Sequence, residues 1–219
     1  MRLSFTEENY LKHILRLSKP GHVVTTNAIA GCLQTKASSV TDMLDKLALK
    51  KLVAYEKYKG VSLTPLGKKT ALAIVRKHRL WEVFLVEKLG FTWDKVHDIA
   101  EQLEHIQSDE LVDKLDIFLG RPKFDPHGEP IPDASGKVKN QKLKLLSECL
   151  AGSTCIISEV NDDSAAFLRH LDKTGLKPGH EIKVTEVIDY DKSLNILVNS
   201  KKNIFISNAI AKNILVTVK

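Results

Sequence analysis

The chain has 219 residues, a length that suits two modest domains or one large one. Its apolar fraction of 43%, mean hydropathy of −0.14 and net charge of +6 indicate a folded core and exclude a disordered chain. No window approaches the ~18 apolar residues of a membrane span, and the first residues do not form a secretory leader, so we expect a soluble, cytoplasmic protein. Three cysteines without a CxxC pair exclude a disulfide framework and a cysteine zinc finger.

Charge is distributed unevenly along the chain. Residues 36–79 hold eleven lysines and arginines against three acids, a net charge of +8. Residues 80–119 hold three against ten, a net charge of −7. A basic segment followed by an acidic one suggests an anionic polymer and a cation as partners, although two solvated faces of opposite sign would give the same pattern.

The first 66 residues predict three helices and a hairpin. A capped helix starts at Thr6 and ends at Lys19-Pro20-Gly21, and a short helix follows Thr25 or Thr26. A third helix over residues 38–51 has apolar side chains at helical spacing. Two β-rich runs, 52–57 and 61–64, flank a turn with Gly60. This order is typical of a winged helix-turn-helix.

Helices dominate the middle of the chain, and strands dominate its end. Helices are predicted from Pro65 through residue 85, over 92–107 and over 108–118. Residues 120–136 hold four of the seven prolines and form an irregular connector, after which 137–150 is partly helical. Five short β-rich runs (154–157, 181–187, 195–199, 204–206, 215–218) and a helix over 163–174 predict a small SH3-like barrel.

These elements indicate an α+β protein with three domains. They are a winged helix-turn-helix domain over residues 1–66, a helical domain over 67–140 that includes the connector 120–140, and an SH3-like domain over 141–219.

Histidines and glutamates recur at helical spacing in the acidic segment. His97, Glu101, Glu104 and His105 fall within an arc of about 100° on one predicted helix. His78 and Glu82, four residues apart, lie on the preceding one. Oxygen and imidazole ligands without thiolate suit Mn²⁺, Fe²⁺ or Zn²⁺. Solvated pairs on exposed helix faces are the simpler interpretation of each pair by itself.

Several stretches resemble the diphtheria-toxin-repressor family of iron- and manganese-dependent transcriptional repressors. They are TEENYL, SSVTDMLDKLALKKLVAYEKYKGVSLTPLGKK, RKHRLWEVFLVEKLGF, KVHDIAEQLEHIQSDEL and DPHGEPIP. The C-terminal run LAGSTCIISEVNDDSAAFLRHLDKTGLKPGHEIKV resembles the SH3-like domain that longer members share with the ferrous-iron transport protein A family. The resemblance spans essentially the whole chain, and the run from RKHRL to EHIQSDE is highly specific.

The resemblance implies two metal sites. The primary site corresponds to a residue of the first helix and the dimerisation-domain helix, here Asn9, Glu101, Glu104 and His105, which His78 can join. The second site uses the His/Glu pair, with contributions from the connector and the SH3-like domain. In this chain it corresponds to His78, Glu82 and His97, with Asp125, His127 and Asp162 as further candidates.

Three positions depart from the family pattern. Iron-sensing members carry a sulfur residue where Glu101 stands, so this chain resembles the manganese-sensing branch. Manganese sensors usually carry aspartate where Asn9 stands, which leaves Asn9 either a weak ligand or none. Asp125 stands where some relatives carry cysteine, and this favours oxygen ligands.

The DNA-binding residues come from the third helix and the hairpin tip. Residues at the start of a helix present side chains and N–H groups to a groove and its phosphates, while a basic hairpin meets the DNA backbone. The candidates are Lys36, Ser38, Ser39, Thr41, Asp42, Lys57, Tyr58 and Lys59. Ser38 and Ser39 are also candidates for simple helix caps.

The favoured hypothesis is a homodimeric, metal-activated repressor of metal-uptake genes that binds a double-stranded DNA operator and Mn²⁺, with Fe²⁺ as the alternative. Such a protein is not an enzyme. A metal-independent winged-helix regulator is the second hypothesis. A small di-iron enzyme is the third, but it needs two Glu-x-x-His motifs, and Glu101 is followed three residues later by Glu104.

Overall fold

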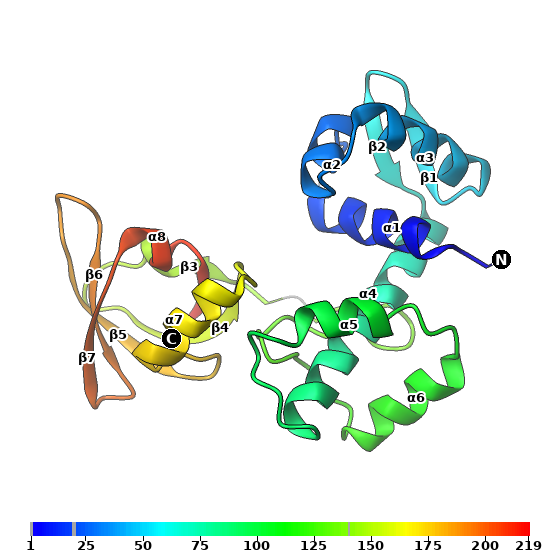
Figure 1. Cartoon of the computed structure of the whole chain (residues 1–219). Coiled ribbons are helices and arrows are strands. Elements are labelled where there is room, and N and C mark those ends of the chain that lie inside the picture. The colour runs from blue at the N-terminus through cyan, green and yellow to red at the C-terminus, as the bar shows by residue number, and fades with distance from the viewer. Residues whose placement is uncertain (1, 19–20, 140) are drawn as a thin grey trace. The chain divides into compact units, whose positions relative to one another are not determined.

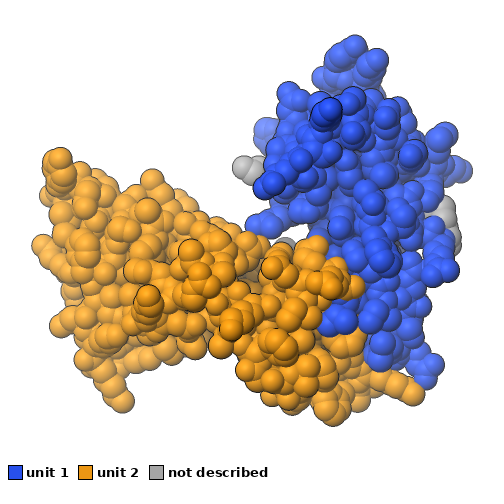
Figure 2. Space-filling model, in the orientation of Figure 1, with its two compact units in different colours: residues 1–78, 103–113, 132–137 blue, residues 79–102, 114–131, 138–219 orange. Residues whose placement is uncertain are grey.

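A computed structural model describes residues 2–18, 21–139 and 141–219 of the chain. The chain forms two compact units, shown in separate colours in Figure 2. Unit 1 comprises residues 1–78, 103–113 and 132–137, and unit 2 comprises residues 79–102, 114–131 and 138–219. No helix among the described ranges combines the length and the apolar character that a membrane span requires.

Three helices open unit 1 (Figure 1): α1 (Phe5–Leu17), α2 (Thr26–Cys32) and α3 (Ala37–Leu49). Helix α1 begins with a capping box in which Ser4 accepts from the Glu7 amide and the Glu7 carboxylate accepts from the Ser4 amide. Its last residue is followed by the cap Ser18. Of the predicted ending, Lys19 and Pro20 lie outside the described residues.

A hairpin and a shared core complete the DNA-binding fold. Strands β1 (Val53–Glu56) and β2 (Gly60–Leu63) pair antiparallel, and Val24 forms a bridge to Val61. The tip requires unusual backbone angles, with φ of 70° at Tyr58 and 114° at Gly60. The core joins apolar side chains of all three helices and both strands, including Leu11, Ile14, Ile29, Val40, Leu44, Leu47, Val53 and Val61. The predicted winged helix-turn-helix is therefore confirmed.

The middle helices are α4 (Pro65–Glu87), α5 (His97–Leu103) and α6 (Asp109–Phe118). The helix predicted over 92–107 is too long at both ends. Residues 93–96 form turns, because Trp93 joins the hydrophobic core of the C-terminal sheet instead of a helix face. At the other end, a turn closed by the amide of Ile106 on the carbonyl of Leu103 ends the helix before Glu104.

Residues 144–218 of unit 2 contain an antiparallel sheet with strand order β3-β8-β4-β5-β6-β7. Its strands are β3 (Lys144–Leu145), β4 (Thr154–Val160), β5 (Glu181–Val187), β6 (Leu194–Val198), β7 (Lys202–Ile206) and β8 (Ile214–Val218). The helices are η1 (Leu146–Glu148), α7 (Ala165–Thr174) and α8 (Asn208–Ala211). Alternating side chains of β4, β5, β6 and β8 fill the core. The SH3-like prediction is confirmed, while β3 and α8 were not predicted.

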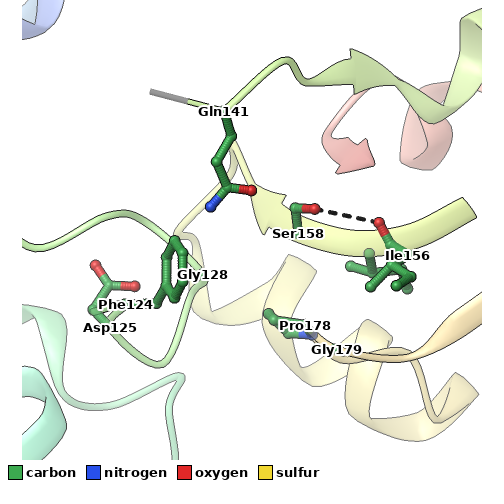
Figure 3. Close-up of a pocket in the computed structure, with 9 residues that line it drawn as sticks. Phe124, Asp125, Gly128, Gln141, Ile156, Ser158, Pro178 and Gly179 are labelled. Carbon is green, nitrogen blue, oxygen red and sulfur yellow. Dashed lines mark hydrogen bonds between the residues drawn. The ribbon is translucent and has the colours of Figure 1, made fainter. Parts of the chain in front are cut away.

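The connector 120–136 is irregular, as predicted, and its residues 124–130 form a tight loop closed by a bridge between Phe124 and Pro130. The carbonyl of His127 accepts from the amide of Val160 on β4, which joins this loop to the sheet. A cavity of about 330 Å³ lies between loop and sheet, lined in part by Phe124, Gly128 and Ser158 (Figure 3).

Candidate metal centres and DNA-binding surface

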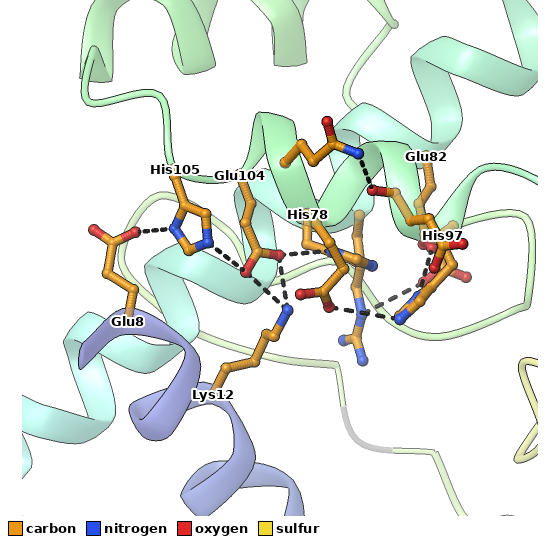
Figure 4. A network of polar contacts seen from close by, with 12 residues as sticks. Glu8, Lys12, His78, Glu82, His97, Glu104 and His105 are labelled. Atoms are coloured by element: carbon orange, nitrogen blue, oxygen red, sulfur yellow. Dashed lines mark hydrogen bonds and ion pairs between the residues drawn. The ribbon is translucent and has the colours of Figure 1, made fainter. Parts of the chain in front are cut away.

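The first cluster of ionisable side chains lies in unit 1 and centres on Glu104, whose carboxylate is fully buried (Figure 4). Its Oε2 lies 2.6 Å from Nδ1 of His78 on α4. Both carboxylate oxygens accept hydrogen bonds from the ammonium of Lys12 on α1, at 2.8 and 2.9 Å. We call Glu104, His105, His78, Glu8 and Lys12 the Glu104 cluster.

His105 extends this cluster toward α1. Its Nδ1 lies 2.6 Å from a carboxylate oxygen of Glu8, and its Nε2 lies 3.9 Å from Glu104. The ring of Phe5 stacks on the imidazole with 4.4 Å between ring centroids. Glu104 and His105 project from the turn after α5, so they do not continue the α5 face that the sequence predicted.

Asn9 carries one of the few unsatisfied polar atoms among the described residues. Its Oδ1 is buried and has no hydrogen-bond partner. A buried oxygen in this state costs free energy unless something else satisfies it. An amide oxygen on α1, the helix that also supplies Glu8 and Lys12, fits the donor chemistry of a divalent cation site.

The second cluster lies in unit 2 and joins α4, α5 and the connector. Glu82, Asp125 and His127 are all buried, and one ligand atom from each lies within 4.8 Å of the other two. His97 on α5 adds its Nδ1 at 3.5 Å from Glu82, and its Nε2 lies 3.5 Å from Glu101. We call Glu82, His97, Asp125 and His127 the Glu82 cluster.

The connector loop orients two of these side chains. Asp125 Oδ1 accepts from the amides of His127 and Glu129, at 2.9 and 3.0 Å. Its Oδ2 is buried without a hydrogen bond. His127 Nε2 lies 3.1 Å from the carbonyl of Trp93, and Nδ1 lies 3.6 Å from Glu82. A carbonyl partner on one ring nitrogen fixes the other as the ligand atom, the usual arrangement around a bound metal.

The guanidinium of Arg79 balances part of the negative charge around the Glu82 cluster. Arg79 reaches Glu129 at 2.9 Å and Asp125 at 3.4 Å. Burial, followed by the charges of Glu82 and Glu129, raises the pKa of Asp125 to about 8. Burial alone would lower the pKa of His127, but the Glu82 carboxylate outweighs it and raises that pKa to about 9. A divalent cation would relieve the same excess of negative charge.

The two remaining metal candidates have different surroundings. Glu101 is half-buried on α5 and faces His97. Asp162 accepts a hydrogen bond from the Ser164 amide just before α7, a local turn contact. Within the described part of the chain, no hydrogen bond or ion pair joins Asp162 to the Glu82 cluster. The structure also adds Glu8 and Lys12, which the sequence analysis did not identify, to the residues of the Glu104 cluster. Their spacing of four residues, which places them on one face of α1, was the only sequence signal.

The DNA-binding candidates are exposed at the start of α3 and at the hairpin tip. Helix α3 has Lys36 as its N-cap and no side-chain capping bond, so Ser38 and Ser39 are not caps. Both serines, Lys36 and Asp42 are exposed, while the Thr41 hydroxyl donates to the Ala37 carbonyl. At the tip, Lys57 lies over the ring of Tyr58, and Lys59 pairs with Glu56 at 2.7 Å. All three hairpin candidates are exposed.

Comparisons with known proteins agree over nearly the whole chain. Residues 2–61 match the N-terminal DNA-binding domain of the iron-dependent repressors, residues 64–133 match their metal-binding and dimerisation domain, and residues 144–218 match the FeoA domain.

Full-length relatives and solved structures match as well. The iron-dependent repressor IdeR of Mycobacterium leprae is 30% identical, with 82% of this chain and 83% of the relative covered. The diphtheria toxin repressor of Corynebacterium diphtheriae is 34% identical over 90% of both chains. The structure of a manganese-dependent transcriptional repressor in complex with manganese superimposes with a TM-score of 0.90 at 34% identity, covering 97% of this chain and all of the other. The manganese regulator SloR gives a TM-score of 0.76 at 33% identity, covering 97% of this chain and 98% of the other.

Proposed function

This chain belongs to the iron-dependent repressor family, and on that premise we propose that it is a manganese-activated repressor of metal-uptake genes, with Fe²⁺ as the alternative signal. Proteins of this family are metal-dependent, DNA-binding and dimeric transcriptional regulators. A repressor of this kind acts in the cytoplasm and catalyses no reaction. We assign the three functional domains to residues 1–66, 67–140 and 141–219, of which residues 1, 19, 20 and 140 lie outside the described residues.

The donor atoms support manganese. The proposed ligands of the first site are Asn9, Glu101, Glu104 and His105 with His78, and those of the second are Glu82, His97, Asp125 and His127. Asp162 is a weaker candidate because its carboxylate already serves the Ser164 amide. Both sets consist of oxygen and imidazole without thiolate, a composition that suits Mn²⁺ and Fe²⁺. When bound, a divalent cation supplies the positive charge that neighbouring carboxylates share.

The observation that carries the proposal is that α1 connects the Glu104 cluster to α3 within unit 1. Helix α3 carries most of the DNA-binding candidates, and we call it the DNA-reading helix. Helix α1 holds Glu8 and Lys12 against Glu104 and His105 on one side. On its other side Leu11 and Ile14 pack in the same core as Val40, Leu44 and Leu47 of α3. A change in how α1 is held at the cluster is therefore transmitted to α3 through this shared core.

Exposed apolar side chains in unit 2 support a dimer. Phe118 and Ile117 at the end of α6 are 64% and 61% exposed, and Leu89 after α4 is 56% exposed. Lys88, the neighbour of Leu89, lies over the ring of Phe118, so the residues that follow α4 lie beside the end of α6. Large exposed apolar groups on such a surface are typical of a protein interface. This surface would join two chains and so present two winged helices to one operator.

Fluorescence anisotropy tests the function with DNA from upstream of a metal-uptake gene and buffered series of Mn²⁺, anaerobic Fe²⁺ and Zn²⁺. We expect metal to tighten operator binding of the wild-type protein. Glu104→Gln and Asp125→Asn keep the side-chain shapes and replace a carboxylate oxygen by an amide nitrogen that cannot bind a cation, so each should raise the metal requirement by about ten- to a hundredfold. Asp98→Asn, at an exposed position on α5, is the control. Equal operator affinity in Mn²⁺ and in EDTA would contradict the proposal.

A further inference from the structure

Lys12 occupies a position that a bound metal ion would also need. Its ammonium lies 2.8 and 2.9 Å from the two oxygens of Glu104, so it bridges the carboxylate as a cation would. His78 contacts the second oxygen at 2.6 Å. The carboxylate, which is fully buried, is therefore neutralised by the protein's own positive charge.

Lys12 is also able to leave. The exposed fraction of its side chain is 13%, against zero for Glu104, so the Lys12 side chain reaches the surface while the Glu104 side chain does not. Lysine carries its charge on a flexible four-carbon stem and readily holds it in water while the stem stays packed. An ammonium and a divalent ion repel strongly at contact distance, so the two cannot share Glu104.

Glu8 makes a complementary contact one helical turn earlier. The carboxylate of Glu8 binds His105, while the ammonium of Lys12 binds Glu104. Helix α1 is thus held to residues 104–105 by two polar contacts. It supplies the carboxylate in one of them and the ammonium in the other. Both contacts join protein groups alone, so the chain can make them without a bound cation.

We propose that Lys12 is a built-in competitor of the metal ion: its ammonium holds Glu104 in the metal-free protein and has to withdraw before a divalent cation binds there. This inference rests on the proposed function and names a residue that sets the metal concentration needed for activation. Lys12 stabilises the metal-free form and thereby raises the metal concentration at which the repressor is activated.

The test is to remove the ammonium and measure metal affinity directly. Lys12→Met keeps the length of the stem, and Lys12→Gln serves as a second, polar variant if Lys12→Met folds poorly. We expect either to bind Mn²⁺ about tenfold more tightly than wild type by calorimetric titration. The metal-free variant should melt at a lower temperature, because Glu104 loses its counter-charge, and saturating Mn²⁺ should restore more of the melting temperature than in wild type.

Lys50→Met is the matched control, because Lys50, which follows α3, makes an ion pair of 2.5 Å with Glu7 of α1, and neither residue belongs to the Glu104 cluster. It should lower the melting temperature without changing the Mn²⁺ affinity. Unchanged or weaker Mn²⁺ binding in both Lys12 variants would overturn the inference and leave Lys12 as a structural ion pair. Glu104→Gln separates the two proposals: if it binds Mn²⁺ as wild type does, the site assignment itself fails.

Discussion

The two most deeply buried carboxylates of the clusters are compensated in different ways. Glu104 is saturated by Lys12 and His78, whereas Asp125 leaves Oδ2 without a hydrogen bond and has Arg79 only at 3.4 Å. A buried oxygen that is orphaned is ready to accept a cation, while a saturated one must first lose a partner. At the scale of single residues, the structure therefore distinguishes Asp125, which has an oxygen without a hydrogen bond, from Glu104, whose oxygens already contact Lys12 and His78.

Gly128 sets the position of the loop that carries Asp125 and His127. Its φ is +88°, and a Cβ would lie 1.9 Å from the carbonyl oxygen of Ser158 on β4. Gly128→Ala should therefore lower the free energy of unfolding by at least ~2 kcal/mol, measured by chemical denaturation. Gly152→Ala is the control, since its φ is also +88° and no atom lies within 4 Å. Equal losses of unfolding free energy in the two variants would contradict a steric clash with Ser158. Backbone strain at positive φ would then be the whole cost.

Among the elements, sequence patterns predicted those whose side chains face one continuous core. Helices α1 and α3, the hairpin and most sheet strands followed from apolar spacing, because Val40, Leu44 and Leu47 bury one stripe and β-branched residues alternate. The end of α5 at Leu103 did not follow, because the pattern continues through Glu104 and His105 after the helix has stopped.

The candidate site was predictable in its residue types but not in its pairings. The spacing of His78, Glu82, His97 and Glu104 identified ligand chemistry. The contacts of Glu8 and Lys12, however, join residues more than ninety positions apart in the sequence. No local rule predicts such pairs. The simpler interpretation of solvated pairs is wrong for Glu82 and Glu104, which are buried.

Strand β4 carries a carboxylate whose titration should influence stability. Burial, and then the charge of Glu129, raises the pKa of Glu159 to about 7, although Arg79 opposes this shift. The folded protein then holds a proton that the unfolded chain releases, so wild-type stability falls as pH rises from about 4.5 to about 7. Glu159→Gln should be more stable than wild type above pH 7, by about 1–2 kcal/mol after allowance for partial exposure.

The Glu159 measurement is denaturant unfolding of both proteins between pH 4.5 and 8.5. The difference should close toward the acidic end, where wild-type Glu159 is itself protonated. Glu148→Gln, at an exposed position, is the control. A difference that does not change with pH, or a variant less stable than wild type at pH 8, would show that the carboxylate is not held in its neutral form.

At the scale of the whole molecule, the two clusters lie in different units, each with its own core. The Glu104 cluster shares unit 1 with the DNA-reading helix, and the Glu82 cluster shares unit 2 with the SH3-like sheet. Loss of ligands in one unit should therefore leave the core of the other intact. We therefore expect operator control to depend most directly on the Glu104 cluster, since α1 shares its core with α3.

If metal binding and operator binding are coupled, the coupling has to be reciprocal. Whatever factor Mn²⁺ contributes to operator affinity, the operator must contribute to Mn²⁺ affinity, since both describe one free energy. Saturating operator should therefore raise the Mn²⁺ affinity measured by calorimetric titration. The increase should equal the factor that anisotropy gives for DNA, in the range of about 5- to 150-fold. Glu104→Gln should reduce both factors together. A large factor for DNA with none for Mn²⁺ would violate this linkage and show that the metal acts outside the protein–operator complex. Factors of one in both experiments would make the chain a winged-helix regulator that does not sense metal.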